Sequence, residues 1–181
     1  MNRVTAALAG LGLVVAAGLV AGTAPAPSVL QGPIPVGAAV GQQAQGRDIV
    51  VTVQGVALAR TLRSDDWTGA ASGVWVVVRL RAETRLTSGA VTGSLTVGGR
   101  TWNVSDRPPV SLDQTSVDPG LPVEGVLAFE VPRSALVDGA ILQLGRSPRP
   151  QADSAIRVRL DLAGAPVRPS LRVDAPQGVG S

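Results

Sequence analysis

The chain has 181 residues, 45% hydrophobic and 16% charged, a composition that fits one folded domain with accessory segments. It contains no His, Cys, Tyr or Lys, so all 16 cationic side chains are Arg. These absences exclude disulfides, metal sites that use Cys or His, Schiff-base lysines and catalytic triads that contain His.

The charge of the chain does not indicate a nucleic-acid-binding protein. The formal net charge is +3, and residues 47–162 carry 13 Arg against 12 Asp and Glu. Only 2% of the residues are aromatic. A nearly neutral domain with so few rings lacks both the basic surface and the stacking side chains of nucleic-acid binders. We therefore predict no nucleic-acid partner.

An uncharged apolar segment follows the cationic start of the chain. After Arg3, residues 4–22 read VTAALAGLGLVVAAGLVAG. As a helix these residues extend about 28 Å, close to the thickness of the hydrocarbon core of a bilayer. We predict that residues 1–22 are a signal anchor or a signal peptide, and we favour the uncleaved anchor. Arg3 then stays in the cytoplasm, and the rest of the chain is exported.

Cleavage is the alternative for this segment. Ala24-Pro25-Ala26 and Val20-Ala21-Gly22 both have the small-x-small pattern of a signal-peptidase site. Cleavage at either site would give a secreted protein rather than a single-pass membrane protein.

Two segments that flank the central part of the chain are rich in Pro and Gly. Residues 23–46 contain four Pro and four Gly, and no charge, which predicts a linker that is partly extended as polyproline II. Residues 164–181 contain three Pro without a period. We predict a flexible C-terminal tail there, with a short extended piece at 171–173.

Residues 47–163 show the two-residue period of β-strands. Alternating apolar residues predict a strand at 49–53, with a bulge at Gly55, and a central strand at 73–83 that is apolar on both faces at its start. Gly98-Gly99 predicts the turn of a hairpin. Further strands are expected near 110–112, 126–131, 141–144 and 156–162. About seven or eight short strands, without a helical stripe, predict an immunoglobulin-like antiparallel β-sandwich.

Two parts of this pattern resemble a known family. They are similar to a bacterial immunoglobulin-like (telokin-like) domain-of-unknown-function family related to the secreted mycobacterial immunoprotective antigen. The first part is Asp118-Pro119-Gly120 followed by Gly125-Val-Leu-Ala-Phe-Glu-Val-Pro132, and the second is the strand from Gly73 to Ala82. The resemblance covers about residues 41–162. It implies an exported or membrane-anchored protein without general catalytic residues. Arg as the only cation also indicates a GC-rich bacterial source, which we predict to be actinobacterial.

Arginines supply the candidate binding residues. Arg79 and Arg81 on one strand, and Arg157 and Arg159 on another, are expected to point outward. If the two strands shared a sheet face, the four guanidinium groups could form a surface for anionic ligands such as phosphate or carboxylate polymers. The alternative is an ordinary polar outer face. Asp65-Asp66-Trp67 could hold Ca²⁺ in its loop, although a solvated turn is the simpler interpretation.

The leading hypothesis is a non-enzymatic, membrane-anchored extracytoplasmic protein of the cell envelope. It would act as a binding or accessory module for an envelope protein partner, and we predict no cofactor, no metal and no catalytic residues. One alternative is a secreted domain that binds anionic cell-wall polymer through the Arg face, and another is a hydrolase that uses carboxylates only. For the core, we expect Phe129 and Trp102 to be largely buried and Trp67 to matter less for stability.

Overall fold

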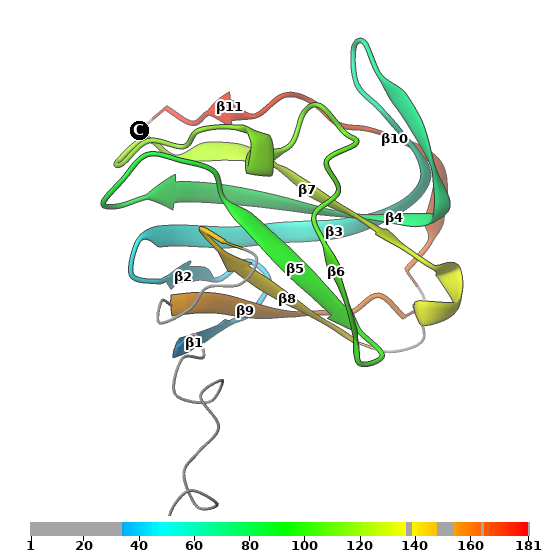
Figure 1. Ribbon diagram of the computed structural model, residues 1–181, viewed down its shortest axis with the longest axis horizontal. Helices are drawn as coiled ribbons and strands as arrows, with labels where there is room; N and C mark the ends of the chain where they lie inside the picture. Colours follow the sequence, from blue (N-terminus) through cyan, green and yellow to red (C-terminus); the bar gives the residue numbers. More distant parts are fainter. Residues whose placement is uncertain (1–33, 137–138, 148–153, 164, 181) are drawn as a thin grey trace, which may run out of the picture. The chain divides into compact units, whose positions relative to one another are not determined.

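The computed structural model describes residues 34–136, 139–147, 154–163 and 165–180, which belong to one compact unit, Pro33–Ser181. These residues form two β-sheets packed face to face (Figure 1). The predicted apolar helix at 4–22 lies outside the described residues. Within them, no helix is both long and apolar enough to cross a membrane.

Sheet A has five strands in the order β1–β9–β8–β5–β6. Their bounds are β1 (Ile34–Ala38), β9 (Ser154–Leu160), β8 (Ala140–Gly145), β5 (Thr92–Val97) and β6 (Arg100–Asn103). Sheet B has the order β10–β3–β4–β7–β11, and β2 also pairs with β3. Its strands are β10 (Val167–Arg172), β3 (Ile49–Arg63), β4 (Thr68–Thr84), β7 (Val123–Val131), β11 (Gln177–Gly178) and β2 (Gln43–Gln45).

The pairing is mixed rather than purely antiparallel, which corrects the prediction. β1 runs parallel to β9, and β10 runs parallel to β3, whereas the other pairs are antiparallel. Both parallel strands come from terminal segments and join the edge of a sheet. A terminal segment can join an edge in either direction, because no short turn fixes its orientation.

Local predictions within the sandwich are largely confirmed. The register of β3 against β4 shifts between Val53 and Gly55, as expected for a bulge. Gly98 and Gly99 have φ values of 54° and 76° and join β5 to β6, which is the turn geometry that glycine permits. The predicted strand at 110–112 is wrong. Leu112–Gln114 instead form a short 3₁₀ helix, η1. A second 3₁₀ helix, η2, follows β7 at Arg133–Ala135.

The main core lies between the sheets, where alternate residues of both sheets meet. It includes Ile49, Val76 and Phe129 from sheet B with Leu142 and Ile156 from sheet A. Full burial of Phe129 confirms that prediction.

A second apolar cluster covers the opposite face of sheet B. Its buried members are Ala59, Leu62, Trp75, Val77, Ala128 and Val173. This cluster explains why β4 begins with apolar residues on both of its faces: β4 is a central strand, between β3 and β7, and both of its faces are covered there.

The boundaries of the domain are wider than the sequence predicts. β1 and β2 lie in the predicted linker 23–46, and β10 and β11 lie in the predicted flexible tail 164–181. Pro35 in β1 and Pro169 in β10 are both in edge strands, where the missing N–H of proline removes no ladder bond. Proline therefore marks sheet edges here, and it is not evidence of unpaired chain.

Candidate functional site

The four predicted arginines do not form one surface. Arg79 and Arg81 are exposed on β4 of sheet B, whereas Arg157 and Arg159 are exposed on β9 of sheet A. The residues between them in each strand are buried in the core between the sheets, so the arginines point to opposite outer faces of the sandwich. Alternation along a strand predicts which side chains point outward, but it does not predict the sheet to which the strand belongs.

The end of the chain crosses the outer face of sheet B. β10 pairs with β3 on one side of the sheet, and β11 pairs with β7 on the other, so residues 173–176 must pass over the strands between them. We call residues 173–176 the C-terminal strap; in Figure 1 they belong to the red part of the chain that leads to β11. Backbone bonds fix its surroundings: Val173 N–H donates to Arg63 O at 2.8 Å, and Val179 N–H donates to Pro122 O at 2.9 Å.

Two adjoining pockets lie on the outer face of sheet B, the first beside β10 and the second beside the C-terminal strap. The first has a volume of about 240 Å³, and the second about 450 Å³. They share Arg79, Val126, Arg172 and Val173 in their linings. We call the first the Arg pocket, because it combines an apolar lining with three arginines. Its lining residues are Gly55, Val56, Ala57, Val77, Arg79, Val126, Arg168, Leu171, Arg172 and Val173.

The three arginines of the Arg pocket differ in their partners. Arg172 forms ion pairs with Asp65 and, at 3.0 Å, with Asp174, and the hydrogen bond with Asp65 raises the pKa of Arg172. Within the described part of the chain, Arg79 and Arg168 have no ion-pair partner. These two guanidinium groups can therefore bind an anionic group that enters the pocket.

A separate polar network surrounds Trp75 on the same face. The Trp75 indole donates to Gly69 O at 3.0 Å and packs edge-on against Trp67, with ring centroids 6.4 Å apart. Arg107 pairs with Glu130 at 2.7 Å and lies over the Trp75 ring, 5.3 Å from its centroid. Burial alone would raise the pKa of Glu130, but hydrogen bonds from Ser72 and Arg107 outweigh it and lower this pKa.

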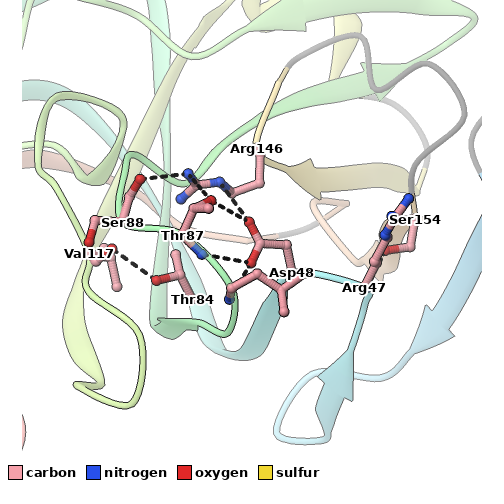
Figure 2. Close-up of polar contacts among 9 residues, drawn as sticks. Arg47, Asp48, Thr84, Thr87, Ser88, Val117, Arg146 and Ser154 are labelled. Carbon is pink, nitrogen blue, oxygen red and sulfur yellow. Dashed lines mark hydrogen bonds and ion pairs between the residues drawn. The ribbon is translucent and has the colours of Figure 1, made fainter.

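Asp48 and Arg146 form another network at one end of the sandwich (Figure 2). Asp48 Oδ1 accepts from Leu86 N–H at 2.6 Å, and its carboxylate also accepts from the backbone and hydroxyl of Thr87. Arg146 lies 3.4 Å from Asp48 Oδ2 and donates to Ser88 O at 2.9 Å. Burial would raise the pKa of Asp48, but these hydrogen bonds and Arg146 lower it. The network fastens the loop after β4 to the start of β3.

The Asp65-Asp66-Trp67 loop has contacts of its own. Asp65 pairs with Arg172, and Trp67 is half-buried against Trp75. The carboxylate that the sequence offers as a calcium ligand therefore already has a cationic partner.

The prediction that Trp102 is largely buried is wrong. Trp102 is only half-buried, because β6 is the edge strand of sheet A. Trp75 is fully buried, but in the outer cluster of sheet B and not between the sheets.

Sequence reasoning missed two residues of the Arg pocket. Arg168 and Arg172 fall in the segment that it interprets as a flexible tail. The apolar residues Leu171 and Val173 were the available signal, because both pack on the outer cluster of sheet B. An apolar pair within a Pro-rich segment favours an edge strand over a free tail.

Comparison with known proteins does not identify a family for this chain. The chain matches no protein-family model and no curated protein. It is similar to the crystal structure of an uncharacterized β-sandwich protein from Clostridium difficile 630, with a TM-score of 0.49 and 11% sequence identity. The similarity covers 71% of this chain and 95% of that one. The two packed sheets themselves make this chain a β-sandwich protein, and the comparisons assign it no activity.

Proposed function

We propose that this protein is a non-enzymatic, membrane-anchored extracytoplasmic module of the bacterial cell envelope that binds a partner through an anionic group. The observation that supports it most is the Arg pocket, where Arg79 and Arg168 have no ion-pair partner among the described residues and lie beside apolar side chains. Such a pocket suits a carboxylate or phosphate group with an apolar neighbour. An envelope protein partner would present this group on its surface.

Two half-buried carboxylates, Asp48 and Glu130, give no support to a hydrolase. A general acid needs a raised pKa, whereas Asp48 and Glu130 both have lowered pKa values and are held in ion pairs. The chain contains no His, Cys, Lys or Tyr to replace them. The Arg pocket itself has no carboxylate in its lining. It is therefore suited to binding and lacks the groups for acid–base chemistry.

Membrane attachment rests on residues 4–22. Because β1 begins at Ile34, only residues 23–33 separate the apolar segment from the domain. Eleven extended residues reach roughly 34 Å, so the anchored domain would remain close to the membrane surface. The second candidate is a secreted domain that binds anionic cell-wall polymer. It differs from the first in that the apolar segment 4–22 is removed by cleavage. The Arg pocket would serve that function as well.

We further propose that the sandwich is immunoglobulin-like. β3, β4 and β7 lie in sheet B, and β5, β6, β8 and β9 lie in sheet A. This distribution corresponds to strands A, B and E facing C, C′, F and G. It supports the resemblance to the telokin-like domain-of-unknown-function family, which we retain as a proposal. β1, β2, β10 and β11 are then additions at the sheet edges.

Fusion of a reporter that is active only outside the cytoplasm tests export. With the reporter joined after Ser181, we expect activity in intact cells, and N-terminal sequencing should find the original start of the chain. A sequence beginning near Thr23 would favour the secreted alternative. A stable but silent fusion would contradict export altogether.

Titration calorimetry with polyphosphate and polyglutamate tests the Arg pocket. We expect binding that weakens as salt is added, because the contacts are ionic. Arg79→Gln and Arg168→Gln should each weaken it roughly tenfold, the equivalent of one charge-assisted hydrogen bond. Arg157→Gln removes the same charge from the other sheet and is the matched control. Equal loss in the control, or no binding by the unaltered protein, would refute the assignment of this pocket.

A further inference from the structure

The large apolar side chains that remain exposed are not scattered evenly. Ile34, Leu86 and Leu121 are 69%, 63% and 62% exposed, and Val40 is 45% exposed; the described residues contain no others of this kind. Single exposed apolar residues are common on soluble proteins. Here, however, three of the four belong to one end of the sandwich.

Hydrogen bonds bring Leu86 and Leu121 to the same end. Leu86 N–H donates to Asp48 at the start of β3. Leu121 follows Gly120, whose N–H donates to Thr84 O at the end of β4, at 3.3 Å. Thr84 is also bridged to Pro119. Both leucines are therefore on loops attached where β4 ends and β3 begins.

Ile34 joins this end through Ser154. Ile34 is the first residue of β1 and pairs with Ser154, the first residue of β9. Ser154 Oγ accepts a hydrogen bond from Arg47 N–H at 2.5 Å, and Arg47 precedes Asp48. Figure 2 shows Arg47 and Ser154 together, in the same view as the Asp48–Arg146 network. Val40 does not lie at this end, because the N–H of the next residue, Gly41, donates to Val53 O, four residues after the start of β3.

Charge at this end is mixed, with exposed cations next to the apolar side chains. Arg47 and Arg85 are exposed, and neither has an ion-pair partner among the described residues. Arg146 is neutralised by Asp48, and Asp118 adds one exposed carboxylate. Surfaces that bind anionic lipid typically combine exposed apolar residues with neighbouring arginines.

We propose that this end of the sandwich is a membrane-contacting surface, in which Ile34, Leu86 and Leu121 enter the headgroup region of an anionic bilayer and Arg47 and Arg85 contact lipid phosphates. A lipid surface is the favoured occupant because the chain leaves this end at Ile34, only 11 residues after the apolar segment. The proposal rests on the anchoring part of the proposed function. It does not involve the Arg pocket.

Site-directed spin labelling of the full chain tests this surface, since the protein has no cysteine of its own. Leu121→Cys carries a label at the surface, and Arg100→Cys carries the control label at the β5–β6 hairpin. Thr92, at the start of β5, pairs with Gly145, which precedes Arg146 in the Asp48–Arg146 network. Val97, at the end of β5, pairs with Arg100, so the control label lies at the opposite end of this strand. Each protein is reconstituted into vesicles of phosphatidylcholine alone or with a quarter phosphatidylglycerol. Accessibility to dioxygen and to a water-soluble nickel complex is then measured.

We expect the label at position 121 to favour dioxygen over nickel severalfold in anionic vesicles, and the label at position 100 to favour nickel. Leu86→Ser should reduce the dioxygen preference at position 121, whereas Val40→Ser, its matched control, should not. Equal nickel accessibility at both positions would overturn the proposal, as would spin–spin broadening at position 121 without dioxygen preference, which would indicate a second copy of the chain.

Retention on the vesicles after an alkaline wash distinguishes this surface from the anchor. If the protein is retained but the label at position 121 is exposed to water, the membrane-contacting surface is refuted and the proposed function is not affected. Protein that washes off refutes the anchor, and the membrane-contacting surface with it. The calorimetric test of the Arg pocket is independent of both results.

Discussion

The guanidinium group of Arg107 lies 5.3 Å from the ring centroid of Trp75, on the side of sheet B that faces away from sheet A. Trp75 is fully buried there among side chains that include Trp67 in the loop before β4 and Val173, which is distant in sequence. The outer face of this sheet is therefore a packed layer with its own energetic contribution, and the stability of the domain should depend on both faces.

Replacement of aromatic residues tests this dependence. Phe129→Ala and Trp75→Ala should each lower the free energy of unfolding by about 3–5 kcal/mol, because both side chains are fully buried. Trp102→Ala should cost less, since Trp102 is half-buried on an edge strand. Urea denaturation of the three variants measures these differences. A larger loss for Trp102→Ala than for Trp75→Ala would contradict the packing of the outer cluster.

The C-terminal strap offers a second test. Val173→Ser should destabilise the domain by about 2 kcal/mol, because the valine is buried against sheet B and the serine hydroxyl would lose its water. Asp174→Ser changes the next residue, which is exposed, and should have a much smaller effect. Thermal unfolding of both variants separates the possibilities. Equal midpoints in the two proteins would show that the strap is not packed.

Two glycines provide a matched pair in neighbouring strands. An added Cβ at Gly73 would lie 2.3 Å from the carbonyl oxygen of Val131, whereas at Gly55 it would meet nothing within 4 Å. Gly73→Ala should therefore force β4 away from β7 and cost about 1–3 kcal/mol. Gly55→Ala should be tolerated. Chemical denaturation measures both changes, and a harmless Gly73→Ala would mean that the two strands separate at little cost.

Acid should weaken the domain through two carboxylates. The pKa values of Asp48 and Glu130 are lowered in the folded protein, so their contributions to stability are fully present above the unfolded pKa values of about 4. They are lost as the pH falls through the folded values, when both groups bind protons. Asp48→Asn and Glu130→Gln should each be less stable at pH 7 and show a flatter decline below pH 4. Melting temperatures between pH 7 and pH 2 give the profile, and variants that follow the profile of the unaltered protein would contradict these two contributions.

Strands in the middle of the chain could be predicted because their apolar residues alternate without interruption. The bulge at Gly55 and the hairpin at Gly98-Gly99 were predictable for a different reason, because glycine occurs at both positions. β1 and β10 could not be predicted in this way. Pro35 and Pro169 are typical of linkers in a sequence, and only the sheet edge reveals why they are tolerated.

The candidate site was less predictable than the fold. Arg79 was identified from its outward position on β4, but the other two arginines of the Arg pocket come from β10, more than 80 residues later. Arg157 was grouped with it wrongly, because a sequence pattern carries no information about which strands become neighbours. Pairing between distant strands is decided by how the two faces pack, and this requires the structure.

The pairing of β10 with β3 also affects the order in which the protein can mature. Val167 pairs with Leu58, 109 residues earlier. In the same way, β1 can pair only after β9 has been synthesised. A ribosome makes β3 and β4 long before the residues that cover Trp75. Until residues 167–173 have been made, the outer side of sheet B remains an apolar surface that these residues do not cover and that a chaperone can bind. Products that stop before Val167 would keep that surface permanently, which would make them substrates for proteolysis.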